Sequence, residues 1–378
     1  MFDLLVKGGL VVDPTQNLEA VLDLAVFDGR IATLEPNIPS EQAERVLNAS
    51  GCLLTPGLVD LHAHLYHGGT SIGAAPDEAC LKHGVTTAVD GGSSGADNFA
   101  GFKKWIAGLS RTRVYCFLHL SSLGLVAIHK AGELANPAYA DPEGALKLLR
   151  THPNLAVGLK LRATEAEVGG PCTPFLRTAR RVADEAAVPI MVHIGNTVET
   201  LPEILAWLKA GDIVTHCMTG RRNGLLDQNG RIWPEVLEAR ARGVLFDAAH
   251  GRSHFTFEIA ARILDQGFLP DSISTDLTAY STGGPVHDLP TTMTKFDTLG
   301  LSISKLVELA ASRPAAILGK DDQFGSLKPG MVADVAALEW EEGDFRLVDA
   351  AGEIRRARRR LKPRFTLRAG DLIWPDAP

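Results

Sequence analysis

The feature that most constrains this chain is an alternation, over roughly 260 residues, of short apolar runs and amphipathic segments. Each run has the length of a buried strand, and the segments between them carry apolar residues at helical spacing. The runs are Leu58–Leu61, Val85–Val89, Val114–Leu118, Leu155–Leu161, Val188–Val192, Ile213–Thr215, Val244–Phe246 and Ser272–Ser274. The clearest helical segments are Thr173–Ala187, Leu201–Ala210, Pro234–Arg242, Phe255–Gln266 and Ser302–Ser312. Eight strand–helix repeats predict an α/β fold, the (β/α)8 TIM barrel. A doubly wound open sheet is the alternative, but it would usually carry a glycine-rich nucleotide fingerprint that this sequence lacks.

The two ends of the chain have a different pattern. The first fifty residues hold short β-prone runs separated by turn signals such as Gly8-Gly9 and Asp28-Gly29. The stretch after Gly330 is similar, with runs at Ala333–Leu338, Phe345–Val348, Phe365–Leu367 and Leu372–Trp374. We expect the ends to pair into one small β-sandwich domain. Residues 1–54 and 326–378 would form it, and residues 55–325 would form the barrel.

Composition limits the partners of the chain. A net charge of −7 over 378 residues argues against general nucleic-acid binding. No apolar run reaches the roughly 18–20 residues of a membrane span. The five cysteines lack CxxC spacing and the N-terminus lacks a signal-type segment, so a cytoplasmic location is expected. We predict a small-molecule substrate and a possible homo-oligomer, and interpret the basic run 355–362 as a solvated face or a subunit contact.

Ionisable side chains stand at the C-terminal ends of several predicted strands, where TIM barrels carry their active sites. The first strand ends in His62-Ala63-His64, whose two imidazoles share one face because strand side chains alternate. Later strands end at His193, His216 and Asp276. One such histidine is more often a hydrogen-bonded core residue. The whole set, converging at one mouth, predicts a metal site because imidazole and carboxylate groups are common metal ligands.

Lys160 is the single lysine in the apolar run of the predicted fourth strand. Strands of a parallel sheet are buried on both faces, and lysine is rarely buried without a partner. Two interpretations remain open. The side chain could extend to the strand end and reach water, or it could be a buried reactive amine with a lowered pKa. Arg162 shares its face, nearer the mouth.

The set His62-x-His64, Lys160, His193, His216 and Asp276 resembles the two-metal form of the amidohydrolase superfamily. It is similar to the dihydroorotase and dihydropyrimidinase relatives and to the deacetylase-like branch. Two flanking motifs agree with this resemblance, Thr55–Asp60 before the first histidines and Gly325–Asp334 near the return to the β domain.

The resemblance implies a role for each residue of the set. His62, His64 and Asp276 would hold the more buried metal ion, and His193 and His216 the second. Lys160, carboxylated by CO₂, would bridge two divalent ions, for which Zn²⁺ suits the ligands best. A hydroxide between the ions would attack the substrate, and Asp276 would take up its proton. The implied enzyme is a binuclear metal-dependent amidohydrolase.

Substrate contacts are expected from the loops after the strands. The candidates are Arg162, His250, Ser253 and Tyr280, although Arg162 could equally form a structural ion pair. We expect hydrolysis of an amide or ester bond, as in deacylation of a small carboxylate-bearing substrate such as an N-acyl amino acid. A cyclic amide hydrolase of the hydantoinase or dihydropyrimidinase type, or a non-catalytic scaffold relative, is the alternative. Tyr66 stands where the family's dihydroorotases carry a substrate-binding arginine, which argues against that activity.

Overall fold

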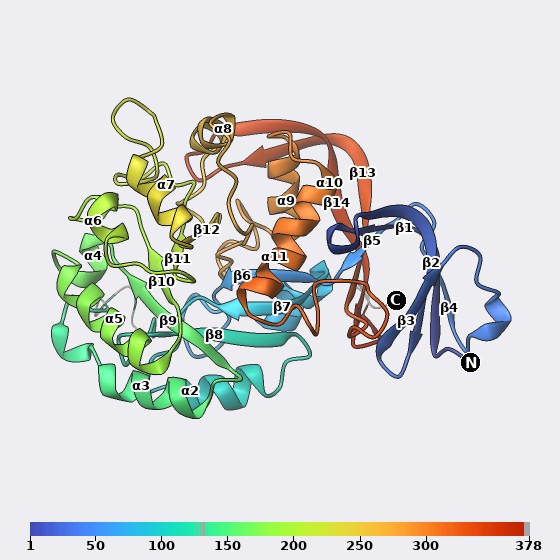
Figure 1. The fold of residues 1–378 in the computed structure, drawn as a ribbon, viewed down its shortest axis with the longest axis horizontal. Helices are drawn as coiled ribbons and strands as arrows, with labels where there is room; N and C mark the ends of the chain where they lie inside the picture. Colours follow the sequence, from blue (N-terminus) through green and yellow to red (C-terminus); the bar gives the residue numbers. More distant parts are fainter. Residues whose placement is uncertain (127, 129, 131–132, 374–378) are drawn as a thin grey trace.

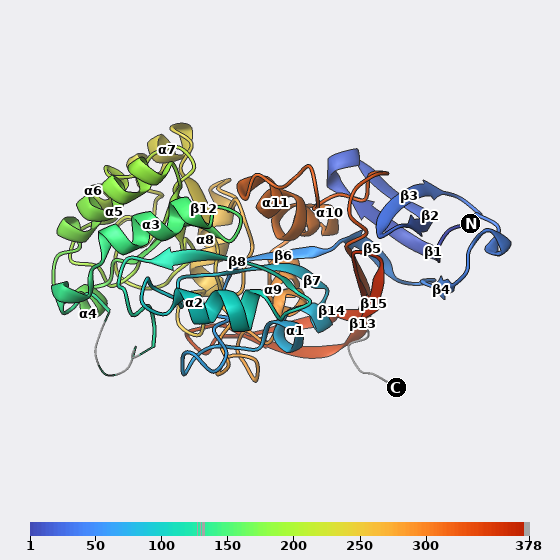
Figure 2. The same cartoon turned by 90° about the horizontal axis from the view of Figure 1, so that it is seen from below.

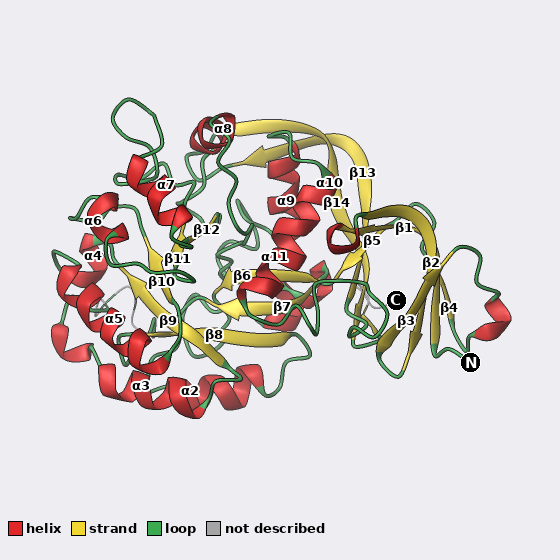
Figure 3. Cartoon of the chain, viewed as in Figure 1, coloured by secondary structure: helices red, strands yellow, loops and turns green. Residues whose placement is uncertain are grey.

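The computed structural model describes residues 1–126, 128, 130 and 133–373. Its larger part is a seven-stranded sheet that curls around a central axis, with helices packed outside it (Figure 1; Figure 3). Neighbouring strands follow one another in sequence and every pair is parallel. The strands are β6 (Leu58–Ala63), β7 (Val85–Asp90), β8 (Arg113–His119), β9 (Ala156–Arg162), β10 (Ile190–His193), β11 (Ile213–Thr215) and β12 (Leu245–Asp247). The predicted barrel architecture is confirmed.

The eighth predicted strand, Ser272–Ser274, is not a regular strand, yet its segment closes the barrel. A parallel bridge joins Ser272 to Asp247 on one side, and another joins Leu277 to Ala63 on the other. Between these two bridges the backbone of Asp276 is left-handed, with a φ of 48°. The mouth of the barrel therefore includes residues 272–277.

Helices cover the outside of the barrel as the periodicity predicts, with different lengths. Four predicted segments contain α5 (Thr173–Ala186), α6 (Leu201–Leu205), α7 (Pro234–Ala241) and α8 (Phe257–Asp265). The last expected helix starts as α10 (Ile303–Val307), widens into a π-helical turn and continues as α11 (Arg313–Ile317). Further helices, beyond the clearest periodic segments, are α1 (Pro76–Ala79), α2 (Phe99–Gly101), α3 (Pro142–Thr151), α4 (Glu165–Val168) and α9 (Leu289–Asp297).

The two ends of the chain pair into a second, mixed sheet beside the barrel, as expected (Figure 2). Its strand order is β15-β14-β13-β5-β1-β2-β3, and β4 also pairs with β1. The N-terminal members are β1 (Leu4–Asp13), β2 (Leu18–Phe27), β3 (Arg30–Glu35), β4 (Val46–Asn48) and β5 (Leu53–Pro56). The C-terminal members are β13 (Val335–Val348), β14 (Ile354–Arg368) and β15 (Asp371–Ile373). Trp374 of the expected last strand lies outside the described residues.

Strands β13 and β14 form one long hairpin rather than the short separate strands expected from sequence. Its far half leaves the end sheet and lies against α9 of the barrel (Figure 1). Leu347 and Leu361 are part of the barrel's apolar core, and the Leu361 amide donates to Thr294 Oγ1 of α9 at 3.0 Å. The basic run 355–362 lies on β14, where Arg356 pairs with Asp344, for example. No helix within the described residues is long and apolar enough to cross a membrane.

Candidate metal centre

Two groups of three side chains meet at the barrel mouth, at the C-terminal ends of the strands. The first group is His62, His64 and Asp276, and the second is His193, His216 and His254. Within each group the candidate ligand atoms all lie within 4.8 Å of one another. The groups adjoin, because the ring centroids of His62 and His216 are 5.2 Å apart. The structure brings together all the ligand positions proposed from sequence and adds His254.

The first group is centred on the carboxylate of Asp276. Asp276 Oδ1 lies 3.1 Å from His64 Nε2 and 3.5 Å from His62 Nε2. The Nζ atom of Lys160 lies 3.0 Å from the same His62 nitrogen. An oxygen and several nitrogens thus converge on one small volume, which is the donor set that a divalent transition-metal ion takes.

The second group turns two imidazole nitrogens toward each other. His216 Nε2 lies 3.1 Å from His193 Nδ1, and the ring of His254 stacks on that of His216 with centroids 3.9 Å apart. Burial holds the pKa values of His193 and His216 well below the usual 6.5. Both rings are therefore neutral near pH 7, the form in which imidazole binds a metal.

Hydrogen bonds behind the histidines fix which nitrogen faces the centre. Thr215 Oγ1 donates to Asp247 Oδ2 at 2.8 Å and therefore accepts from His62 Nδ1, also at 2.8 Å. His216 Nδ1 donates to the Ala249 carbonyl at 2.8 Å. In both rings the protonated Nδ1 is held from outside, which leaves Nε2 unprotonated and turned toward the centre, where it meets Lys160 Nζ in His62 and His193 Nδ1 in His216. Metal-binding histidines are oriented in this way.

The turn after β7 makes room for the centre. Asp90 Oδ1 accepts from the Gly92 and Ser93 amides, and Ser93 Oγ lies 2.9 Å from His64 Nδ1. Gly92 has a φ of 96°, and a Cβ atom there would come within 2.6 Å of Lys160 Cγ. A side chain at position 92 would therefore displace the lysine.

Lys160 has no solvent exposure. Burial lowers its pKa from 10.5 to about 7, even though the charge of Asp276 acts in the opposite direction. Among the described residues its hydrogen-bond partners are His62 Nε2 and the Met191 sulfur at 3.3 Å. An ammonium group with three protons lacks oxygen acceptors here. This favours the interpretation of Lys160 as a buried reactive amine over that of a side chain reaching water.

The backbone is strained at two of the candidate ligands. His216 and Asp276 have φ values of 71° and 48°, in the left-handed region that L-residues rarely occupy. Such conformations cost of order 1–3 kcal/mol each and cluster at functional sites. His216 directly follows β11, and Asp276 lies in the segment 272–277 that closes the barrel.

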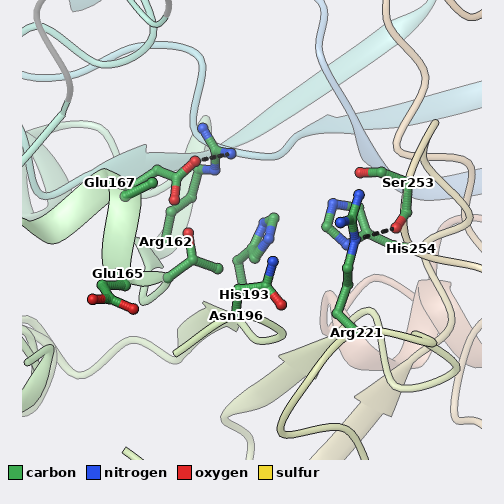
Figure 4. Close-up of a pocket in the computed structure, with 10 residues that line it drawn as sticks. Arg162, Glu165, Glu167, His193, Asn196, Arg221, Ser253 and His254 are labelled. Carbon is green, nitrogen blue, oxygen red and sulfur yellow. Dashed lines mark hydrogen bonds and ion pairs between the residues drawn. The ribbon is translucent and has the colours of Figure 1, made fainter. Parts of the chain in front are cut away.

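A pocket of about 530 Å³ opens beside the second group (Figure 4). Its walls contain Arg162, Thr164, Glu165, Ala166, Glu167, His193, Asn196, Arg221, Ser253 and His254. Two of the four predicted substrate contacts, Arg162 and Ser253, thus line it. Tyr280 is 54% exposed and is not among the lining residues. His250 is fully buried, with Nδ1 donating to the Gly251 carbonyl and Nε2 bonded to Lys295 Nζ, both at 2.7 Å.

The family model described as "Amidohydrolase family" matches residues 53–356, most of the chain. The chain belongs to the amidohydrolase family. Members of this family generally bind two metal ions, and the two groups at the mouth are the matching feature of this amidohydrolase. It is a hydrolase acting on carbon–nitrogen bonds.

Individual relatives cover nearly all of this amidohydrolase. It is 33% identical to a deacetylase of Agrobacterium fabrum, over 92% of this chain and 85% of the relative. It is 31% identical to a deacetylase of Enterococcus faecalis, over 98% and 99% of the two chains. A crystal structure of an adenine deaminase superposes with a TM-score of 0.90 at 31% identity, covering 99% and 100%. A dihydroorotase structure gives 0.90 at 32%, covering 98% and 97%. The names differ, so they do not fix the substrate.

Sequence reasoning missed His254 and Arg221. The rule that located the other ligands looks for an ionisable residue at or near the C-terminal end of a strand, whereas His254 and Arg221 lie farther along, in the loops after β12 and β11. Nothing in the spacing of His250-Gly251-Arg252-Ser253-His254 distinguishes the second histidine from the first. Only the folded loop shows that His250 turns inward and His254 joins the centre.

Proposed function

We propose that this amidohydrolase is a binuclear metal-dependent deacylase, which hydrolyses the amide or ester bond of a small carboxylate-bearing molecule such as an N-acyl amino acid. The observation that carries the proposal is the pair of adjoining ligand groups with Lys160 beside them. The relatives named deacetylase, which align over nearly the whole chain, support this chemistry.

The donor set fits two divalent ions, with Zn²⁺ the best match for imidazole and carboxylate ligands. We assign His62, His64 and Asp276 to one ion and His193 and His216 to the other, with His254 close enough to contribute. When bound, such ions polarise the scissile carbonyl and lower the pKa of the attacking water toward neutrality.

Lys160 would complete the centre as a carbamate. The ammonium form first loses one proton. The neutral amine nitrogen then adds to CO₂ and releases a second proton, so that an anion with two oxygen atoms replaces a buried cation. The lowered pKa of about 7 supports this step, because a substantial share of the amine is then neutral and nucleophilic near pH 7. The product would bridge the two ligand groups and remove the cost of a buried ammonium.

Asp276 is placed to move the proton. Its Oδ1 atom lies 3.5 Å from His62 Nε2 and 3.1 Å from His64 Nε2, among the proposed ligands of the first ion. In the proposed reaction its carboxylate accepts the water's proton and delivers it to the leaving amine or alkoxide. Ser253, in the pocket wall, is placed to contact the substrate.

A cyclic amide hydrolase is the second candidate, and the dihydroorotase structure at 32% identity favours it. Tyr66 argues against dihydroorotase itself. Its hydroxyl donates to the Asn98 carbonyl at 3.0 Å and its ring packs edge-on against Phe102, so it does not supply a cation to a substrate. A scaffold role does not account for the full set of ligands.

The test combines metal analysis with a substrate panel. We expect elemental analysis of the purified protein to find two divalent ions per chain. N-acyl amino acids of both configurations and O-acyl hydroxy acids should then be hydrolysed faster than hydantoin, dihydrouracil and dihydroorotate. Ring opening faster than deacylation would transfer the assignment to the cyclic amide hydrolases. A chain that binds no metal would support the scaffold alternative.

A further inference from the structure

Two arginines line the pocket beside the metal centre, and they differ in whether a carboxylate of the protein already pairs with the guanidinium group. Arg162 ends β9, and Arg221 lies in the loop after β11, on the other side of His193 (Figure 4). A substrate carboxylate would need one guanidinium group with free donors. The choice between them rests on the proposed function, because it asks which residue recognises the substrate of that site.

The guanidinium of Arg162 is already engaged by two carboxylates. Its Nη1 atom contacts Glu133 Oε1, and its Nη2 atom lies 2.9 Å from Glu167 Oε1. Glu133 is buried and also meets His119 Nε2 at 2.9 Å. A substrate carboxylate could take up this fork only by displacing a carboxylate of the protein, which would leave a buried charge unpaired. Arg162 therefore stabilises the wall of the pocket by joining Glu133 and Glu167.

Arg221 has the opposite surroundings. Its Nε atom donates to the Ser253 carbonyl at 3.1 Å, and its backbone amide donates to Thr219 Oγ1 at 3.2 Å. Among the described residues no carboxylate lies within 4.0 Å of its guanidinium, and neither terminal nitrogen has a hydrogen-bond partner. Arg221 is an exposed residue. The Ser253 contact holds its Nε atom beside His254, and both Nη atoms are open to a ligand from the pocket (Figure 4).

The neighbouring arginine shows that this freedom is specific to position 221. Arg222 Nη2 lies 3.3 Å from Glu165 Oε2 and donates to the Thr197 carbonyl at 3.0 Å. Glu165 and Glu167 form the acidic part of the pocket wall, and each already pairs with an arginine. Arg221 is thus the one pocket-lining arginine without an acidic partner among the described residues.

We infer that Arg221 binds the substrate's carboxylate and so restricts the site to acyl compounds that carry one, α-acylamino or α-acyloxy acids. A free guanidinium fork binds a carboxylate through two parallel hydrogen bonds. His193 and His254 line the same pocket, so a carboxylate held at Arg221 leaves the acyl group beside the metal ligands. Arg162 is a positioning residue in this assignment.

The test compares N-acetylalanine with its neutral primary amide, in both configurations, on the metal-loaded full chain. Arg221→Gln should raise KM for the acid by about 10- to 100-fold, the worth of a charge-assisted pair. Its KM for the amide, its kcat and its metal content should change little. Arg222→Gln is the matched control and should leave both substrates unchanged. Arg221→Lys should restore part of the preference for the acid.

If Arg221→Gln raised KM equally for the acid and for the amide, the assignment would be overturned, since loss of a structural residue would affect both substrates. A preference for the acid that disappears in Arg162→Gln and survives in Arg221→Gln would transfer the role to Arg162. If the wild-type enzyme hydrolyses neither compound, the proposed function fails separately. Calorimetric binding of N-acetylalanine to the wild type and to Arg221→Gln then decides the assignment, and equal affinities would reject it.

Discussion

Two lysines are completely buried in the described part of the chain, and they stand in contrasting surroundings. Lys160 lies on β9 at the barrel mouth, and Lys295 lies on α9 under the long hairpin. Burial lowers the pKa of each from 10.5 to about 7. Exposure and pKa therefore do not distinguish them. What differs is the set of atoms that receives their protons.

Lys295 has three acceptors for its three protons. They are His250 Nε2 at 2.7 Å and the carbonyls of Pro285 and Val348, both at 2.8 Å. These acceptors belong to the loop after β12, the loop before α9 and the end of β13. The lysine thus joins three segments, and every donor is satisfied. This is the environment of a structural side chain.

Lys160 meets one imidazole nitrogen and one thioether sulfur, and sulfur is a weak acceptor. A buried amine with such poor partners is costly, so its retention favours a chemical role. The comparison shows that the acceptor set, rather than the depth of burial, separates a structural lysine from a reactive one.

The largest effect is expected from Lys160→Ala. Loss of the proposed bridging group should reduce deacylation by about 10⁴-fold and deplete the metal, because it removes several kcal/mol of electrostatic stabilisation. Short carboxylic acids should partly restore both, as substitutes for the carbamate. Lys295→Ala is the control, since acids should not rescue any defect it causes. Full activity with two metal ions in Lys160→Ala would end the bridging role.

The second-largest effect is expected from Asp276→Asn. Its kcat should fall by about 10³-fold, because an amide cannot accept the proton of the attacking water. The amide oxygen can still bind a metal, so elemental analysis should find partial loading. Asp90→Asn is a useful comparison, because Asp90 acts through Ser93 on the position of His64. Unchanged turnover in Asp276→Asn would exclude this residue as the proton carrier.

Lys160 was predictable from sequence, whereas Lys295 was not, and the reason is physical. The run Leu155–Leu161 is otherwise apolar, as a strand buried on both faces should be, so the lysine within it is conspicuous in the sequence. Lys295 lies in a helix that contacts both the barrel and β14, so α9 is buried on nearly all sides and has no amphipathic stripe. Its threonines, at 291, 292 and 294, also have low helix propensity.

The rest of the fold and of the site divides in the same way, into features that a local sequence pattern predicts and features that depend on contacts between distant segments. The barrel strands were predictable because apolar runs and strand-end ligands are local patterns. The hairpin was not, since its far half packs on α9 and on the start of α8, which are distant in sequence. The loop residues His254 and Arg221 depend on how two loops fold over the mouth, and no periodicity encodes that. The ion pair between Arg162 and Glu133 likewise depends on a loop, because Glu133 lies in the loop after β8.

Lys295→Met tests the structural side of the comparison. The substitution keeps the length of the chain but leaves two carbonyls and one imidazole nitrogen without their donor. We expect a loss of about 3 kcal/mol in the free energy of unfolding, measured by urea denaturation, because unsatisfied buried acceptors cost about 1–3 kcal/mol each. Metal content at low temperature should stay near wild type. A variant as stable as wild type would show that the three contacts are not needed to join the segments.

The smallest expected effect is a change with pH in the difference between the unfolding free energies of the wild type and of Lys295→Met. The folded-state pKa of Lys295 is about 7 and its unfolded value is 10.5, so between these values the unfolded chain binds the extra proton. Wild-type stability therefore gains from this group as pH rises, whereas Lys295→Met lacks the contribution. The stability difference should widen by about 2 kcal/mol from pH 7 to pH 9, because each pH unit in this window is worth about 1.4 kcal/mol. Paired urea titrations at the two pH values measure it. A constant difference would mean that the three acceptors keep Lys295 charged up to pH 9, so that its hydrogen bonds outweigh its burial.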